Sequence, residues 1–366
     1  MDDEMSEISD TSPLPSTEVY YQTSTDQHSN SWRTFKFDDY TQRVVLSVFF
    51  IIIATLGIFG NSMVVLGVIL CRKLRTVTNI FVVNLAVADL LTALTIPWNA
   101  VALLSRSGWP LPEWVCVVVA LVSFTCVGCS LFTLATIAIN RWLVITQSLN
   151  AFRRVYTPVN LTFMILAIWS VPFLVALVPP MVGLGELGYA DKYSTCSHKT
   201  THPLSDYYSV LQTLIFYPVP LVIIIVCYVK VYLHVKRHMK AMTEQAEGSS
   251  TSMHASLKRQ SSQQQLRLSK RQVEITKNLF YVVLAFLICI TPYGVALMIP
   301  PSDPAIPWTA AILLCNSCVN PMIYATKHPN FKLVFRYMLT CKCHRIPEQS
   351  EFLRSVRYLN ARRQSR

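Results

Sequence analysis

The chain of 366 residues is 52% hydrophobic and only 14% charged, which is too apolar for a soluble domain of this length. Its formal net charge of +12 would favour nucleic-acid binding in a soluble protein. The basic residues are divided by compartment along the chain and do not form one patch, so no nucleic-acid partner is expected.

Seven long apolar stretches follow one another along the chain. Each is near or above the ~20 residues that a helix needs to cross the hydrocarbon layer of a membrane. Because only closed helices satisfy their own backbone polar groups in lipid, an all-α bundle of seven transmembrane helices is predicted. The expected spans are 44–70, 80–104, 115–144, 161–180, 210–232, 279–299 and 308–325.

The distribution of Lys and Arg predicts the orientation of these spans. With the amino terminus outside, segments facing the cytoplasm hold 26 of the 32 Lys and Arg residues. This asymmetry follows the positive-inside rule. We therefore expect a multi-pass protein of the plasma membrane with an extracellular amino terminus.

Composition divides the chain into segments. Residues 1–42 are rich in Ser, Thr and acidic residues, which predicts a disordered extracellular tail. Since no apolar region precedes the first span, that span is expected to act as its own insertion signal. The other expected segments are the seven-span domain 43–328 with a flexible inner loop 237–270, an amphipathic helix on the inner membrane surface at 329–343, and a basic cytoplasmic tail at 344–366.

The cysteines sort by compartment in the same way. Only Cys116 and Cys196 lie on the oxidising side, so a disulfide between them is predicted. This bridge would hold the second outer loop over the mouth of the bundle. Cys341 and Cys343 follow the amphipathic helix, where palmitoylation is expected.

Polar residues within the spans are expensive, so each is a functional candidate. The lone carboxylate of Asp89 and several hydroxyl and amide groups fall near mid-bilayer depth. Such oxygen ligands suit a small hard cation such as sodium, and a purely structural hydrogen-bonded network is the alternative, although the two are not exclusive. The polar residues at this depth are Asn61, Asp89, Ser130, Asn316, Ser317 and Asn320, and the last five are the candidates for a sodium site.

Several motifs within and between the spans resemble those of the rhodopsin-like G-protein-coupled receptors. The resemblance extends from Val44 to Cys343, and chance does not explain so many motifs in order. The motifs are Gly60-Asn61, Leu85-Ala86-Val87-Ala88-Asp89, Trp109 before Cys116, Asn140-Arg141-Trp142, Trp169, Pro220 with Tyr228, Phe286 with Cys289-Ile290-Thr291-Pro292, and Asn320-Pro321-Met322-Ile323-Tyr324.

The resemblance implies a receptor that is not an enzyme and needs no cofactor, although an inhibitory sodium ion at the Asp89 site is implied. Arg141 would hold the inactive state and then contact a heterotrimeric G protein, with arrestin and receptor kinases as further partners. The residues implied in coupling and activation are Asn140, Arg141, Trp142, Tyr228, Asn320, Pro321 and Tyr324.

Three positions depart from the family pattern. Asn140 replaces the acidic residue usual before the arginine, and Gln272 stands where many relatives have an acid, although Glu274 is close. Either change is expected to raise activity without ligand by destabilising the resting state. Ile290 replaces the usual tryptophan of the sixth span.

The ligand class is constrained mainly by missing groups. Ser123 replaces the aspartate that pairs with amines, and Leu314 replaces the retinal-binding lysine of opsins. A small uncharged or lipophilic extracellular ligand is therefore expected, with simple helix packing as the alternative role of each candidate. The candidate pocket residues, called the upper set below, are Trp98, Asn99, Ser123, Phe124, Gln212, Phe216, Tyr293 and Met298.

Within the family, the chain resembles most the melatonin receptors and the insect moody and trapped-in-endoderm receptors. Ala138-Ile139-Asn140-Arg141 and Asn316-Ser317-Cys318 are melatonin-like, whereas the segment 179–188 is more like moody. This resemblance suggests coupling to Gi/Go proteins.

Two other classes remain as alternatives. A decoy receptor would bind ligand without signalling, but Arg141, Tyr228 and Tyr324 are present. A membrane transporter would be expected to show paired repeats and several charges within the membrane, and the chain has an odd number of spans and one clear buried carboxylate.

Overall fold

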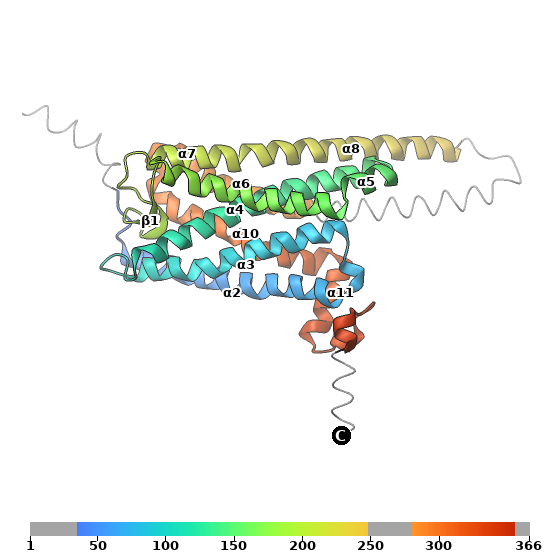
Figure 1. Ribbon diagram of the computed structural model, residues 1–366, viewed down its shortest axis with the longest axis horizontal. Coiled ribbons are helices and arrows are strands. Elements are labelled where there is room, and N and C mark those ends of the chain that lie inside the picture. The colour runs from blue at the N-terminus through green and yellow to red at the C-terminus, as the bar shows by residue number, and fades with distance from the viewer. Residues whose placement is uncertain (1–34, 248–279, 356–366) are drawn as a thin grey trace, which may run out of the picture.

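A bundle of helices lying side by side forms the protein (Figure 1). The computed structural model describes residues 35–247 and 280–355, and within them seven helical segments are long and apolar enough to cross a membrane. The predicted all-α, seven-span fold is confirmed. The spans are formed by α2 (Tyr40–Leu70), α3 (Val77–Leu104), α4 (Glu113–Thr146), α6 (Pro158–Met181), α7 (Ser205–Phe216) with α8 (Pro218–Glu247), the helix Phe280–Met298, and α10 (Ile306–Lys327).

The two ends of the bundle carry different elements. At one end, strands β1 (Leu187–Ala190) and β2 (Thr195–His198) pair antiparallel in a hairpin, with Leu187 opposite His198. At the other end, α11 (Pro329–Leu339) follows α10 (Figure 1). These are called the hairpin end and the α11 end. Short elements complete the structure: η2 (Arg72–Leu74), α5 (Leu149–Val155), η3 (Pro300–Ala305) and η4 (Cys343–Arg345).

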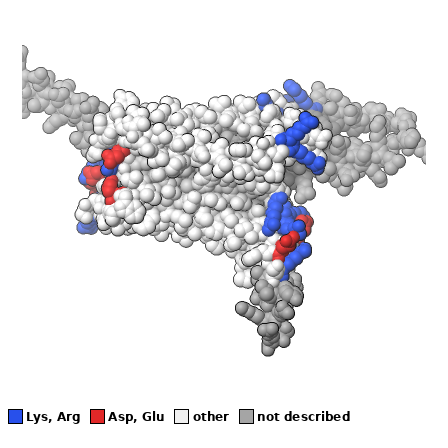
Figure 2. All heavy atoms as spheres, viewed as in Figure 1, with Lys and Arg blue, Asp and Glu red and all other residues white. Residues whose placement is uncertain are grey.

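Charge also distinguishes the two ends. Figure 2 shows acidic and basic side chains mixed at the hairpin end, while Lys and Arg predominate at the α11 end. The long middle of the molecule presents neither sign of charge on the visible face, as expected for a surface that contacts lipid.

Side-chain caps define where several spans begin. The carboxylate of Asp39 accepts a hydrogen bond from the Thr41 N–H (2.9 Å) before α2. The Thr76 hydroxyl caps α3 in the same way, and Thr157 caps α6 directly before Pro158. Each cap satisfies a backbone N–H that has no partner within its own helix.

The fifth span is interrupted at Tyr217, between α7 and α8. Pro218 and Pro220 have no backbone N–H, so they cannot donate to the carbonyls of Leu214 and Phe216 four residues earlier. The sequence therefore divides one span into two helical segments near the hairpin end.

Glycines allow some helices to approach one another closely. A Cβ added at Gly60 would lie 2.8 Å from the Cβ of Pro321, and one at Gly128 would lie 2.7 Å from the Cβ of Pro172. Within lipid, small residues at such contacts permit van der Waals packing of backbones. These contacts join α2 to α10 and α4 to α6.

Hydrogen bonds between side chains and neighbouring helices also orient the helices relative to one another. The amide of Asn61 donates to the carbonyl of Ser317 (2.7 Å), which links α2 to α10. Asn84 donates to the Thr133 hydroxyl (2.8 Å) and accepts from the Trp169 indole N–H (2.9 Å), which links α3, α4 and α6. Polar side chains within the spans thus fix the rotation of neighbouring helices.

The folded part begins before residue 43, the boundary expected from the sequence. Phe37 is buried and its N–H donates to the Lys192 carbonyl (2.9 Å), while Lys36 forms an ion pair with Asp191 (2.8 Å). The chain before α2 therefore packs against the turn of the hairpin. Further along, α8 continues to Glu247 within the expected loop 237–270; the rest of that loop, and Gln272 and Glu274, lie outside the described residues.

The chain after α11 returns to the end of α2. The Arg72 N–H donates to the Glu348 carbonyl and the Ser350 N–H donates to the Leu70 carbonyl (both 2.9 Å). We call residues 346–351 the return segment; its Ile346 and Ser350 are buried. Ordered structure therefore continues beyond residue 344, where a basic tail was expected to begin.

The amphipathic helix is shorter than the expected 329–343. α11 ends at Leu339, because Cys341 has a left-handed backbone (φ 53°) that an α-helix does not contain. Cys341 is exposed and Cys343 is half-buried.

Candidate functional site

The carboxylate of Asp89 lies in the centre of the bundle and is fully enclosed by protein. Its Oδ1 accepts from the Ser130 hydroxyl (3.0 Å) and its Oδ2 accepts from the Asn320 amide (2.7 Å). These partners come from α4 and α10, so three helices meet at one buried carboxylate. The residues that the sequence placed at this depth are brought together.

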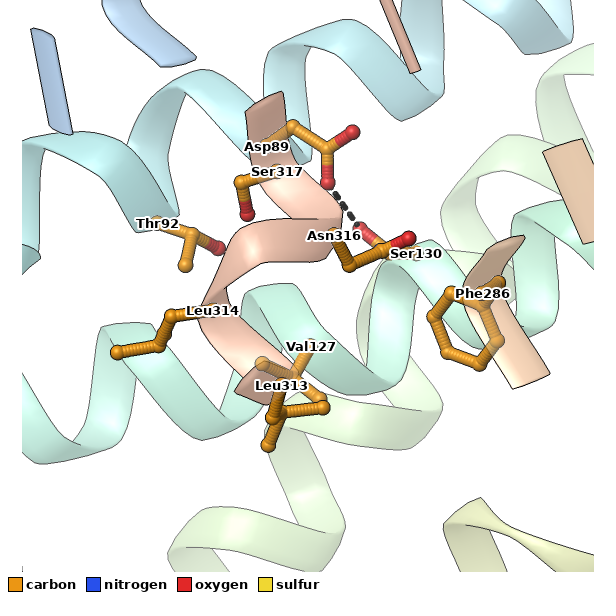
Figure 3. Close-up of a pocket in the computed structure, with 9 residues that line it drawn as sticks. All are labelled: Asp89, Thr92, Val127, Ser130, Phe286, Leu313, Leu314, Asn316 and Ser317. Carbon is orange, nitrogen blue, oxygen red and sulfur yellow. Dashed lines mark hydrogen bonds between the residues drawn. The ribbon is translucent and has the colours of Figure 1, made fainter. Parts of the chain in front are cut away.

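A small cavity lies beside this carboxylate (Figure 3). Its volume is about 10 Å³, close to the lower limit of roughly 10–15 Å³ that one water molecule needs. The Oδ1 atoms of Asn316 and Asn320 are buried without a hydrogen-bond partner within the described part of the chain. The cavity is lined by Asp89, Thr92, Val127, Ser130, Phe286, Leu313, Leu314, Asn316 and Ser317.

This donor set fits a sodium ion. It offers one carboxylate, hydroxyl oxygens and an unpartnered amide oxygen, which are the hard oxygen ligands that such cations prefer. Asn61 contributes no ligand atom to the lining, since its amide binds the carbonyl of Ser317.

The predicted disulfide between Cys116 and Cys196 is present and holds the hairpin on α4. The Cys196 N–H also donates to Oδ1 of Asn99 on α3 (2.8 Å). Asn99, a member of the upper set, is thereby engaged with the hairpin backbone. Together the two contacts close the hairpin end of the bundle.

His198 of β2 enters the interior where the upper set was expected. Its ring stacks on Phe124 (centroids 4.4 Å apart) and meets Tyr208 edge to face (4.4 Å). Its Nδ1 lies 3.0 Å from the hydroxyl of Ser209. Because that hydroxyl donates to the Ser205 carbonyl, Nδ1 carries the proton and donates to it.

His198 belongs to none of the motifs in the sequence. It lies two residues after Cys196, and alternate residues of a strand point to the same face of the hairpin. The disulfide directs Cys196 toward α4, so the same alternation directs His198 there as well. This alternation can be recognised only once the loop is known to form a strand.

Burial lowers the pKa of His198 to about 4. The ring is therefore neutral at physiological pH. Gln212 is also buried, so the polar groups around His198 are enclosed by protein.

The other members of the upper set lie in different surroundings. The Ser123 hydroxyl lies 2.8 Å from that of Thr95, and Phe216 packs edge to face on Phe132. Tyr293 is half-buried. Trp98 and Met298 are 42% and 51% exposed, so these two lie at the edge of the set.

A second anchor holds the loop after β1. Asp303 of η3 accepts a hydrogen bond from the Tyr193 hydroxyl and forms an ion pair with Lys192, both at 2.7 Å. Burial and the neighbouring Asp303 carboxylate raise the pKa of Tyr193, so its hydroxyl stays protonated.

At the α11 end, Arg141 is buried (5% exposed) and its Nε has no hydrogen-bond partner among the described residues. Within the same residues no carboxylate lies within ion-pair distance of it. The hydroxyls of Tyr228 and Tyr324 are also buried and unpartnered in this part of the chain.

Asn140 is engaged elsewhere. Its Oδ1 accepts from the Thr78 hydroxyl (2.7 Å), and its Nδ2 is buried without a hydrogen-bond partner among the described residues. Trp142 has the Lys230 ammonium over its ring at 4.7 Å. Asn140 therefore links α4 to α3, while Arg141 lacks an ionic partner among the described residues.

The family described as "7 transmembrane receptor (rhodopsin family)" matches residues 60–324. The chain belongs to this family of G-protein-coupled receptors. It is therefore a multi-pass membrane receptor and not an enzyme.

Individual relatives cover most of the receptor. It is 26% identical to 5-hydroxytryptamine receptor 4 of Rattus norvegicus, over 82% of this chain and 77% of the relative. It is 29% identical to melatonin receptor type 1A of Ovis aries, over 78% and 75%. The crystal structure of squid rhodopsin shares its fold with a TM-score of 0.71 at 22% identity, covering 85% of this chain and 90% of that one.

Protonation of His198 is expected to lower the folding stability of the receptor. An unfolded histidine titrates near 6.5, above the folded value of about 4, so folding stability is complete above about pH 6.5 and falls as the pH drops toward 4. The total loss is roughly 3 kcal/mol. Thermal unfolding of the purified receptor, measured across this pH range, should show the loss of stability.

The variant His198→Gln should flatten this pH dependence, because glutamine does not titrate. His202→Gln, in the same loop, serves as the control and should keep the wild-type profile. An unchanged profile in His198→Gln would show that another group is responsible.

Proposed function

We propose that the receptor lies in the plasma membrane with its amino terminus outside and binds a small, uncharged or lipophilic extracellular ligand at the hairpin end. Binding there activates heterotrimeric G proteins of the Gi/Go class at the α11 end. The main supporting observation is Arg141, a buried cation without an ionic partner in the described chain, at the end of the bundle opposite the disulfide. A buried charge in that state is costly, so a second arrangement in which it finds a partner is favoured.

The orientation is supported by charge. The predominance of Lys and Arg at the α11 end agrees with the positive-inside rule, which puts that end in the cytoplasm (Figure 2). The disulfide at the opposite end then lies in the oxidising compartment.

The chemistry of the upper set supports an uncharged ligand. Ser123 bonds to another hydroxyl, and the neighbouring His198 is neutral at physiological pH. A cationic amine such as 5-hydroxytryptamine, for which one relative is named, would find no carboxylate among these residues. Melatonin, for which another is named, carries no amine charge and fits this set better.

The proposed G-protein class, the other cytoplasmic partners and the palmitoylation sites each have their own support. Gi/Go coupling is supported by the resemblance to melatonin receptors. Arrestin and receptor kinases are proposed on the family membership. Palmitoylation of Cys341 and Cys343 is supported by their accessibility directly after α11.

The proposed function is tested by G-protein dissociation in cells expressing the wild type or Arg141→Ala. Both are measured without ligand and then with melatonin-like indoles, lipids and peptides, using sensors for Gi/Go and for the other G-protein classes. We expect a Gi/Go signal in the wild type that Arg141→Ala abolishes at equal surface expression.

Other outcomes separate the alternatives. Ligand binding to a wild type that activates no G protein would identify a decoy receptor. A signal confined to another G-protein class would contradict the Gi/Go assignment alone.

We also propose that Asp89 and its neighbours hold an inhibitory sodium ion. The support is the small cavity and the unpartnered Oδ1 of Asn316. Replacing choline chloride by sodium chloride should raise the Tm of the wild type by about 3 °C when sodium is at ten times its Kd. Asp89→Asn should lose this rise and the exposed control Asp206→Asn should keep it; an equal rise in both would place sodium elsewhere.

The residue before Arg141 should control activity without ligand. In Asn140→Asp the new carboxylate still accepts from Thr78 and gives Arg141 an adjacent negative charge. A charge-assisted hydrogen bond of about 1.5–3 kcal/mol corresponds to a fall of about tenfold or more in ligand-free activity. G-protein dissociation in cells without ligand measures this fall in activity.

Asn140→Ala provides the control, because it removes the contact with Thr78 without adding charge. No fall is expected in that variant. Ligand-free activity of Asn140→Asp equal to the wild type, at matched surface expression, would contradict the role given to the missing acid.

A further inference from the structure

A second cavity, of about 300 Å³, opens at the hairpin end, away from the upper set. It lies between the start of α2, the loop that follows α3, and the turn of the hairpin. None of its lining residues belongs to the upper set or to the Asp89 site. Its lining includes Lys36, Asp38, Arg43, Arg106, Asp191 and Ser194.

Arg43 is the buried cation of this cavity, with 7% of its surface exposed. Its Nε donates to the Leu103 carbonyl (2.6 Å), and its Nη2 donates to the carbonyls of Ala102 and Ser105. These carbonyls end α3, so Arg43 caps the negative end of that helix dipole.

Carbonyl dipoles solvate the charge of Arg43 without neutralising it. No carboxylate of the described chain lies within ion-pair distance of Arg43. Its Nη1 makes no hydrogen bond with those residues, so two N–H donors remain at the cavity that Arg43 lines. A buried cation normally has an anionic partner.

The other charges of the cavity leave an excess of positive charge. Lys36 is already paired with Asp191 (2.8 Å). Arg106 lies over the Tyr40 ring (4.1 Å) and has no ion pair in the described chain. Asp38 is exposed, so three cations face two carboxylates in the lining.

We propose that this cavity binds an oxyanion group, a carboxylate, sulfate or phosphate, between Arg43 and Arg106. Guanidinium groups bind such groups through paired N–H donors in a fixed geometry. The anion comes from solution or from the headgroup of an acidic lipid at the membrane surface.

Binding here couples three separate parts of the chain. Arg43 belongs to α2, Arg106 to the loop after α3, and Ser194 to the hairpin turn. An anion held among them adds a further attachment of the hairpin to the bundle, besides the one that Lys192 and Tyr193 make through Asp303 of η3. The site is thus an allosteric anion site, separate from the proposed ligand pocket.

The experiment measures the Tm of the full chain in nanodiscs. In neutral phosphatidylcholine, inorganic phosphate is titrated against chloride at constant ionic strength. In a second arm, phosphatidylglycerol is titrated into the lipid without phosphate. We expect a saturable rise in Tm in at least one arm, and the arm identifies the source of the anion.

Arg106→Gln is the test variant, because Arg106 is exposed and its loss leaves the fold intact. The apparent affinity for the anion should fall about tenfold in it, which is the loss expected for one charge-assisted contact. Arg153→Gln removes an equally exposed arginine from α5 at the other end and should behave as the wild type. An equal rise in wild type and Arg106→Gln, or no rise in either arm, would overturn the proposal.

Discussion

The buried carboxylate of Asp89 is the interaction on which the arrangement of the helices depends. A carboxyl group in the middle of a membrane bundle has to find its hydrogen bonds on other helices. Ser130 and Asn320 supply them from α4 and α10, which fixes how both helices are rotated relative to α3. Asn320 directly precedes Pro321, which packs on Gly60 of α2, so the same turn of α10 is fixed from two sides.

The two ends of the bundle are held by different kinds of interaction. At the hairpin end a disulfide, the Asn99 contact and the Asp303 ion pair close the structure. At the α11 end the described residues leave polar atoms of Arg141, Tyr228 and Tyr324 buried without partners. Each such atom costs about 1–3 kcal/mol, so this end stores free energy that a rearrangement or a bound partner recovers.

Much of this could be predicted from the sequence, because the membrane imposes simple rules. The length of the apolar stretches predicted the seven spans, and the compartment of the cysteines predicted the disulfide. The depth of polar residues in the bilayer predicted the partners of Asp89. What could not be predicted depends on contacts distant in the chain. The inward position of His198 depends on the strand register of a loop, and the packing of Phe37 against the hairpin leaves no periodic signal. Exposure of Trp98 and Met298 depends on helix rotation, which apolar patterns fix poorly in helices that are hydrophobic on most faces.

The return segment makes the end of α2 part of one mechanical unit with α11. Two backbone hydrogen bonds join residues 348 and 350 to Arg72 and Leu70, and the side chains of Val334 and Phe335 approach Gly67 one turn earlier. Any outward tilt that carries α11 therefore has to pull the end of α2 with it or break these bonds. The end of α2, the return segment and α11 therefore form one connected frame at this end of the bundle.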